Sequence, residues 1–306
     1  MNTYTTAQCP PGPHGAAGVG WLCEVSGQPV LLATCLACAR HRQQLACPFP
    51  PTILAALARS LAGETELVEL RALADDAHVA LLRVTALLGC TRQAWYALHG
   101  PAPLEKPSRH WARLRGTIFH AALESLAGED VVAEVRLVAR LDADQRAGVR
   151  AWVSGRIDHY DPLTRTVLDY KTIHSFGKAM TRLDLPKPQH RRQLWLYAWL
   201  LAENGYPPPL AGRVTYMDMH TVLSVDVAMP DAGGLARTTE YVVSKARAIT
   251  EAGSNGPPGD AAEDWLCRYC THAERCPDAH PKGNGAARNA EVIAGDGPVG
   301  DGSTVK

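Results

Sequence analysis

Hydrophobic positions change between a helical and an alternating period several times along the middle of the chain. Residues 109–128 and 189–205 have the helical period, and each segment ends at a glycine, Gly128 or Gly205. A long helical pattern also occupies residues 233–253. Short strand patterns lie between these helices, at residues 131–140, 149–158, 165–172, 212–219 and 221–229. This order predicts an α/β domain.

The two ends of the chain differ in composition from this middle part. Residues 1–51 are rich in Cys, Gly and Pro, so we expect a small appended module in which metal replaces a large core. The following residues, up to 99, have a helical pattern with Thr85 as an N-cap. The last part is Gly-rich, which is typical of a disordered tail. The predicted domains are therefore 1–51, 52–280 and 281–306.

The 31 basic and 31 acidic side chains give a formal net charge of zero, which excludes a generally basic nucleic-acid coat protein. Positive charge is concentrated locally, and the candidates for DNA contacts are Lys178, Arg182, Lys187, Arg191 and Arg192. A solvated loop before a helix would explain the same charges. The sequence has no apolar run of about 20 residues and no basic and apolar leader. We therefore expect a cytoplasmic protein that does not enter membranes.

A cluster of charge lies in the predicted hairpin of residues 155–172. Asp158 ends the first strand, while Asp169 and Lys171 are two residues apart in the second and therefore share a face of the sheet. Neighbouring carboxylates repel unless a cation lies between them, and Mg²⁺ or Mn²⁺ meets that need. The Lys171 ammonium would then offset charge on a phosphate during hydrolysis. A salt-bridged surface hairpin is the alternative.

Two residues outside the hairpin are candidates for the same site. His120 shares one face of its helix with Gly116, and its imidazole is a candidate metal ligand. An isolated helical histidine also fits an ordinary core or surface position. Glu134 shares a strand face with Arg136. It is either a further ligand or a solvent-side partner of Arg136, and we favour the second interpretation.

These residues belong to an ordered series of motifs: Gly116-x3-His120-x2-Leu-Glu124, Gly155-Arg-Ile-Asp158, Asp169-Tyr-Lys171-Thr172 and Gln193-x3-Tyr197. The series resembles the RecB-like branch of the PD-(D/E)XK nucleases, over roughly residues 83–280. The resemblance implies a restriction-endonuclease-like core, with a central mixed β-sheet flanked by helices. It also implies that His120, Asp158 and Asp169 bind Mg²⁺ or Mn²⁺. Lys171 would be catalytic, and Gln193 and Tyr197 would support the site and the DNA strand.

Nine cysteines in a chain without an export signal favour metal or redox chemistry over a disulfide scaffold. Cys267-x2-Cys270-x5-Cys276 offers three thiolates, and Cys90 is an available fourth. In the iron-sulfur subset of the resembling nucleases, four such cysteines hold one 4Fe-4S cluster, which would clamp the ends of the domain. The Pro usual after the first cysteine is replaced by Thr91 here. A zinc site that uses His272 is the structural alternative.

The early cysteines are candidates for a separate zinc site. Cys35-x2-Cys38 is half of a zinc ribbon. Cys9 with Cys23, Cys9 with His14, or a set that uses His41 or Cys47 would complete the ribbon. The candidate Zn²⁺ ligands are Cys9, Cys23, Cys35 and Cys38. Buried thiols without metal are the alternative.

The whole pattern is most similar to the CRISPR-associated exonuclease family numbered four. That resemblance implies a metal-dependent exonuclease that trims DNA ends. The expected substrate is single-stranded DNA, and the expected partners are CRISPR integrase proteins or a recombination complex. A phage or a recombination and repair nuclease would carry the same motifs. A non-catalytic DNA-binding subunit would have lost ligands, whereas Asp158, Asp169 and Lys171 are all intact.

Overall fold

The structure is a computed structural model that describes residues 20–40, 47–62, 79–100, 104–125, 130–141, 149–173, 176, 185–260, 266–267 and 270–279. Several predicted features lie outside these ranges: Cys9, His14, His41, Lys178, Arg182 and the predicted tail at 281–306. Within the described ranges, no helix is both long and apolar enough to cross a membrane.

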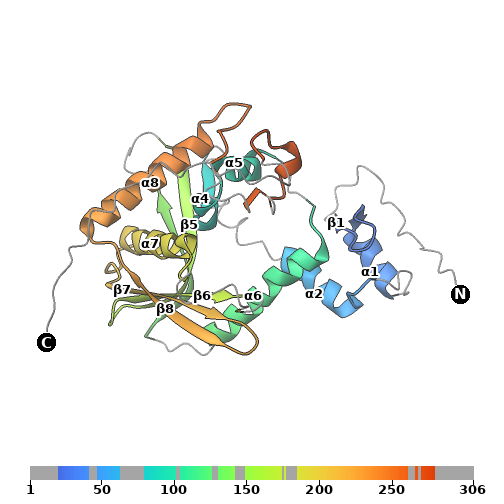
Figure 1. Cartoon of the computed structure of the whole chain (residues 1–306), viewed down its shortest axis with the longest axis horizontal. Helices are drawn as coiled ribbons and strands as arrows, with labels where there is room; N and C mark the ends of the chain where they lie inside the picture. Colours follow the sequence, from blue (N-terminus) through green and yellow to red (C-terminus); the bar gives the residue numbers. More distant parts are fainter. Residues whose placement is uncertain are drawn as a thin grey trace, which may run out of the picture.

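A six-stranded mixed sheet forms the centre of the larger lobe (Figure 1). Its strands follow the order β3-β5-β6-β7-β8, and β4 pairs with β5. The β3–β5 and β6–β7 pairs are parallel, and the other three pairs are antiparallel. The predicted mixed α/β architecture is confirmed. The strands are β3 (Ala80–Arg83), β4 (Val132–Arg140), β5 (Ala151–Asp161), β6 (Thr166–Thr172), β7 (Ala211–Met217) and β8 (Val222–Ala228).

Helices bury the apolar side chains of this sheet. Helix α7 (Pro188–Glu203) connects the parallel strands β6 and β7, and its leucines lie in the main core. Helix α8 (Ala232–Thr250) packs against α7, and it also contacts α4 (Val84–Leu88) and α5 (Thr91–His99). Helix α6 (Pro107–Ser125) instead contacts β4 and β6, and it extends from the sheet toward the N-terminal elements (Figure 1).

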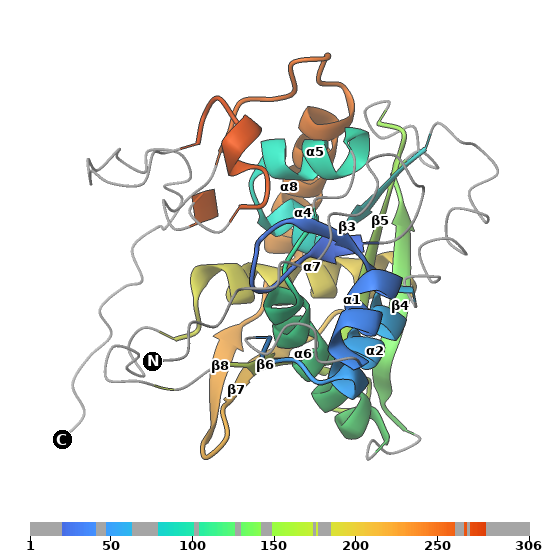
Figure 2. The ribbon, with the colours of Figure 1, turned by 90° about the vertical axis from the view of Figure 1, so that its right-hand side faces the viewer.

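The N-terminal elements form a small lobe beside α6 (Figures 1 and 2). They are the hairpin of β1 (Gly20–Leu22) and β2 (Pro29–Leu31), followed by α1 (Leu32–Arg40) and α2 (Pro51–Ala62). This lobe has its own buried cluster, against which two residues of α6, Trp111 and Leu114, pack. The cluster extends into α2, beyond residue 51. Its buried members are Trp21, Cys23, Val30, Cys35, Leu54 and Leu57.

Two local predictions in the region 52–99 are wrong. Residues 80–83 form strand β3, which pairs in parallel with β5, instead of a helix. Four mainly apolar residues are too few for periodicity to separate a buried strand from a buried helix. Thr85 is not an N-cap, because α4 is preceded by Arg83 and α5 by Cys90 in the N-cap positions.

Candidate active site

The β5–β6 hairpin opens into a fork at the predicted acidic residues. The Asp161 carboxylate closes the turn, and β6 then pairs with β5 only as far as Leu168. From Asp169 onward, the described partner of β6 is β7. The Tyr170 N–H donates to a side-chain oxygen of β5, Asp158 Oδ2, at 2.8 Å. Asp158 and Asp169 therefore flank the point where the two strands separate.

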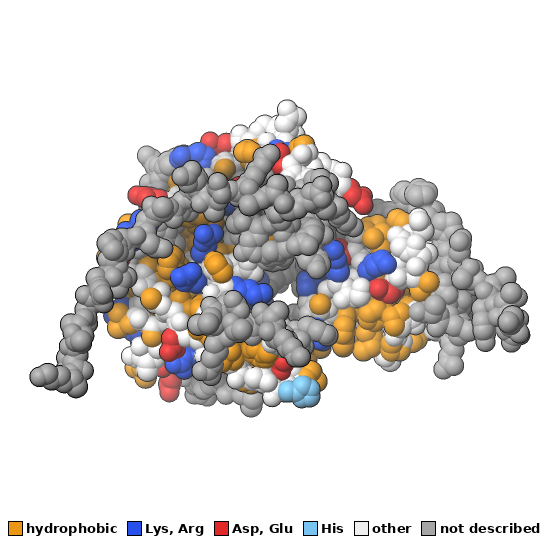
Figure 3. Space-filling view, viewed as in Figure 1, with side chains coloured by type: hydrophobic (Ala, Val, Ile, Leu, Met, Phe, Trp, Pro, Cys, Tyr) orange, Lys and Arg blue, Asp and Glu red, His pale blue; other side chains and the backbone are white. Residues whose placement is uncertain are grey.

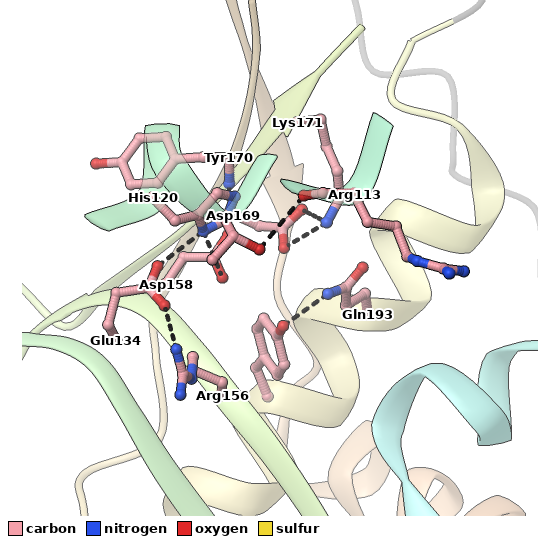
Figure 4. A network of polar contacts seen from close by, with 11 residues as sticks. Arg113, His120, Glu134, Arg156, Asp158, Asp169, Tyr170, Lys171 and Gln193 are labelled. Atoms are coloured by element: carbon pink, nitrogen blue, oxygen red, sulfur yellow. Dashed lines mark hydrogen bonds and ion pairs between the residues drawn. The ribbon is translucent and has the colours of Figure 1, made fainter. Parts of the chain in front are cut away.

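Three potential metal ligands meet beside this fork (Figure 4). His120 Nδ1 on α6 lies 2.7 Å from Glu134 Oε1 on β4 and 3.6 Å from Asp158 Oδ1 on β5. One ligand atom from each residue lies within 4.8 Å of the other two, and no other group of three in the described chain is this compact. An imidazole with two carboxylates suits a divalent cation. The structure thus brings the predicted ligands His120 and Asp158 together.

Glu134 is the third potential ligand, although the sequence favoured a solvent-side position for it. The solvent-side interpretation is wrong, because only 5% of the Glu134 side chain is exposed. Its neighbours Ala133 and Val135 pair with His159 and Ile157 of β5, so Glu134 lies near Asp158, and neighbouring carboxylates repel unless a cation lies between them. Its backbone φ of 50° is uncommon for a residue other than glycine. Strand alternation predicts which residues share a face, but it does not say which face is covered by α6.

Asp169 is fully buried and paired with Lys171. The Lys171 ammonium donates to Asp169 Oδ1 at 2.8 Å and lies 2.7 Å from Oδ2. Oδ2 is buried, yet it accepts no well-aligned hydrogen bond. A nearby cation or an ordered water would satisfy such an atom. The Lys171 side chain is 21% exposed, so this ion pair lies at the edge of the buried region.

The electrostatics of the fork favour a cation. Burial, and then the charge of Asp169, raises the pKa of Asp158 to about 7, although Lys171 and His120 act in the opposite direction. Burial also raises the pKa of Asp169, and the hydrogen bond to Glu134 raises the pKa of His120. Protons and a divalent cation would compete for the same atoms. The residues present therefore fit Mg²⁺ or Mn²⁺.

The comparison with known proteins agrees with this geometry. The sequence profile described as the PD-(D/E)XK nuclease superfamily matches residues 132–277, a segment that includes Glu134, Asp158, Asp169 and Lys171. This match supports a PD-(D/E)XK nuclease superfamily domain in this segment. Such a domain implies a metal-dependent nuclease, that is, a hydrolase that acts on nucleic acid. His120 lies on α6, which precedes the matched segment.

Two further comparisons add no functional information. The solved structure titled "Crystal structure of SSO0001" shares 20% sequence identity with this chain, at a TM-score of 0.49. The alignment covers 75% of this chain and 95% of that one. A likeness at this level carries no argument about activity. No curated protein matches the chain.

Helix α7 packs on the interior side of the fork. Gln193 Nε2 donates to Tyr197 Oη at 2.6 Å, and both side chains are buried. Burial, followed by the charges of Asp158 and Asp169, raises the pKa of Tyr197, so its phenol stays neutral beside the acidic group. The two predicted support residues therefore contact each other close to the fork (Figure 4).

The described basic residues of the predicted DNA-contacting stretch lie at the start of α7. Lys187 is half-buried in the N-cap position, whereas Arg191 and Arg192 are exposed. Between them, His190 Nδ1 lies 2.7 Å from Tyr216 Oη. Burial and the charges of Lys171 and Lys187 lower the pKa of His190 to about 3, so this imidazole is neutral. The positive charge near Lys171 thus comes from lysine and from the helix N-terminus.

The four predicted cluster cysteines line one pocket of the nuclease domain. Cys90 lies at the junction of α4 and α5, and it faces the same pocket as the late cysteines Cys267, Cys270 and Cys276. His272 is 5% exposed and also lines this pocket. The structure forms no disulfide among the cysteines it describes. The fold thus brings together four thiols that are up to 186 positions apart in the chain, from 90 to 276.

Thr91 has a structural use that Pro could not provide. Its N–H donates to Asp260 Oδ1, and its hydroxyl donates to Asp260 Oδ2, each at 2.5 Å. Lys245 Nζ also bonds to Asp260 Oδ2, at 2.5 Å. Proline has neither the N–H nor the hydroxyl. The departure from the usual sequence therefore ties the start of α5 to the segment that leads to the late cysteines.

Proposed function

We propose that this chain is a Mg²⁺- or Mn²⁺-dependent DNA exonuclease that hydrolyses phosphodiester bonds at DNA ends, with single-stranded DNA as its preferred substrate. The observation that carries the proposal is the compact group of His120, Glu134 and Asp158 beside the Asp169–Lys171 pair. This arrangement lies in a nuclease domain, and it combines metal-ligating atoms with a partly exposed lysine side chain.

Each residue of the fork has a role in this proposal. His120, Glu134 and Asp158 would hold the ion, with Asp169 close by, and Asp169 would also orient Lys171. When bound, the divalent cation would lower the pKa of the attacking water and reduce the negative charge on the phosphate. Lys171 would donate to the phosphate oxygen on which charge increases in the transition state. Gln193 and Tyr197 would keep the helix side of the fork fixed.

Surface charge supports a nucleic-acid substrate. Several Lys and Arg side chains lie across the middle of the face shown in Figure 3. Lys187, Arg191 and Arg192 add positive charge at the start of α7, and we assign Lys178 and Arg182 to the same DNA path. Because net charge is zero over the chain, this local concentration is what would attract a phosphate backbone.

The pocket of Cys90, Cys267, Cys270 and Cys276 is proposed to hold a 4Fe-4S cluster. Phosphodiester hydrolysis transfers no electron, so the cluster would act as a clamp. Hydrogen bonds already join the same elements, since Tyr96 donates to the Arg275 carbonyl at 3.0 Å. Iron and sulfide analysis of the purified chain tests this proposal. Zinc without iron would favour the alternative site that includes His272.

The decisive experiment uses end-labelled linear DNA, closed circular single-stranded DNA and linear RNA, each with Mg²⁺, Mn²⁺ or no divalent cation. We expect metal-dependent loss of linear single-stranded DNA, with the circle and the RNA left intact. Cleavage of the circle would contradict the exonuclease mode. The absence of any metal-dependent product from cluster-containing protein would favour a non-catalytic DNA-binding subunit.

The biological setting is proposed from the resemblance. An exonuclease of this kind would trim prespacers for CRISPR integrase proteins, and the alternative is a phage or a recombination and repair nuclease. Trimming of a duplex with single-stranded overhangs in the presence and absence of an integrase complex separates these settings. A change in product length with the integrase supports the CRISPR role.

A further inference from the structure

A second group of thiols lies far from the nuclease fork, in the small N-terminal lobe. Cys23 follows β1, Cys35 and Cys38 are on α1, and Cys47 precedes α2. The first three are 5%, 8% and 5% exposed, respectively. Cys35 and Cys38 are three positions apart on a helix, so their side chains share one face. Three separate segments therefore contribute thiols to the same part of the lobe.

The four thiols are close enough to influence one another. Burial, together with the charges of the nearby Cys47, Cys23 and Cys38, raises the pKa of Cys35 to about 11. The pKa of Cys47 is also raised, by burial and then by Cys23 and Cys38, while its bond with the Phe49 backbone acts in the opposite direction. Four thiolates at one place would repel strongly unless a metal ion neutralised them.

A buried, unsatisfied donor points to the same place. The Trp21 side chain is 0% exposed, and its indole N–H has no hydrogen-bond partner of good geometry. This side chain lies next to Cys35, and a hydrogen bond from its N–H would lower the pKa of that thiol, that is, favour the thiolate. A buried N–H without an acceptor costs about 1–3 kcal/mol. A metal-bound thiolate at Cys35 is the acceptor that this N–H lacks, because its sulfur carries negative charge.

We propose that Cys23, Cys35, Cys38 and Cys47 form a thiolate site for one zinc-class metal ion. This set replaces the sequence candidate Cys9 with Cys47. In the described chain, no three of these thiols are as close as the atoms of the His120, Glu134 and Asp158 group. Zinc binds thiolates at sulfur–metal distances of about 2.3 Å. The thiols would therefore have to move closer together when the ion binds.

The physical need for such an ion follows from the size of the lobe. Six residues form its buried cluster, and two of them, Cys23 and Cys35, are themselves ligands of the proposed site. Lobes this small commonly depend on metal because their cores supply little stabilisation. The ligand segments are one hairpin, one helix and the start of another, so the ion would fix all three relative to one another.

The lobe that would hold the proposed ion is hydrogen-bonded to the start of α6. Glu24, next to Cys23, accepts a bond from the Ser108 N–H at 3.0 Å, and its carbonyl accepts one from Lys106 at 3.2 Å. The Leu22 N–H donates to the Glu105 carbonyl at 3.0 Å. These bonds hold the start of the helix that carries His120. The N-terminal ion would thus be structural and remote from catalysis.

Elemental analysis of the full chain and single Cys→Ser variants test the site. We expect Cys35→Ser and Cys47→Ser each to lose one equivalent of zinc relative to wild type, and Cys9→Ser, the matched control, to lose none. Because Cys47 is half-buried, its variant keeps the test valid if Cys35→Ser does not fold. Co²⁺ replacement should give a sulfur-to-cobalt absorption band that disappears in both variants.

Three results on zinc and cobalt binding would overturn the assignment, and one on iron would do so as well. They are a chain that binds no zinc or cobalt at this site, a Cys47→Ser variant that retains the full metal content, or a Cys9→Ser variant that loses it. Iron and sulfide bound through these four cysteines would replace zinc with a cluster, and would therefore also refute the zinc-class assignment. None of these measurements depends on nuclease activity, so failure of the nuclease proposal would leave them interpretable.

Discussion

Replacing Asp158 with Asn should stabilise the metal-free protein while abolishing its response to divalent cations. Asn has nearly the same shape as Asp, and its side-chain oxygen can still accept the bond from the Tyr170 N–H. The substitution therefore removes one buried negative charge and preserves the local hydrogen bond. The repulsion between Asp158 and Asp169 disappears, and so does one anionic ligand of the proposed metal.

The magnitude follows from the pKa of Asp158. A rise from 3.8 to about 7 corresponds to about 4 kcal/mol of free energy of unfolding, at 1.36 kcal/mol per pKa unit. Because the pKa of Asp158 is higher in the folded state, the folded state binds more protons than the unfolded state between these two pH values. Stability is therefore lost as the pH rises from about 4 to 7. Asp158→Asn should recover up to about 4 kcal/mol at pH 8 and almost nothing at pH 4.

Urea titrations at pH 4, 6 and 8, with the protein dialysed free of Mg²⁺ and Mn²⁺, measure this difference. Saturating Mn²⁺ should then raise the urea midpoint of the wild type at pH 8 and leave that of Asp158→Asn unchanged. Asp161→Asn is the matched control. Its carboxylate is bonded within the turn and its pKa is lowered, so this substitution should destabilise the protein at pH 8. Equal stability of Asp158→Asn and wild type at pH 8 would refute the reasoning.

Three further substitutions test other parts of the structure. Lys171→Ala should reduce the cleavage rate by about 10²- to 10³-fold while Mn²⁺ still raises the urea midpoint; loss of that Mn²⁺ response would contradict a catalytic role. Gly155→Ala should cost about 1–3 kcal/mol in urea unfolding, because its Cβ would lie 2.7 Å from Leu200 Cδ1 and 2.9 Å from Val84 Cγ2. Gly253→Ala, whose Cβ would have nothing within 4 Å, should be neutral, and equal effects would count against the packing argument. Cys270→Ala should remove iron and visible absorbance and lower the urea midpoint, whereas Cys47→Ala should keep the absorbance; retained iron in Cys270→Ala would exclude this ligand.

The parts of the site that the sequence predicted are those fixed by local chemistry. The turn at Asp161 uses hydrogen bonds to residues two and three positions away, so the hairpin that carries Asp158, Asp169 and Lys171 is encoded within a short segment. Alternation along β6 then places Asp169 and Lys171 on one face, where they form their ion pair. The pattern on α6 likewise places His120 on a definite helix face.

The features that the sequence did not predict depend on contacts between distant elements. Glu134 faces His120 because α6 crosses β4, and nothing in the strand pattern identifies the face that this helix covers. Strand β3 exists because its four residues pair with β5 in the core, although a buried helix would have the same composition. The sequence left Cys47 as one of several alternatives, because its proximity to Cys35 depends on how α2 packs on α1.

Two aspartates on one strand favour a functional site at the fork over a salt-bridged hairpin. Asp161 accepts bonds from neighbouring N–H and hydroxyl groups, and these bonds lower its pKa, so its ionised form stabilises the fold. Asp158, three positions earlier, is buried beside Asp169, and its ionised form is disfavoured in the absence of metal. A hairpin built only for stability would have an apolar or amide side chain at position 158, because a buried unbalanced carboxylate weakens the fold. The destabilising charge makes physical sense if a divalent cation binds there during function.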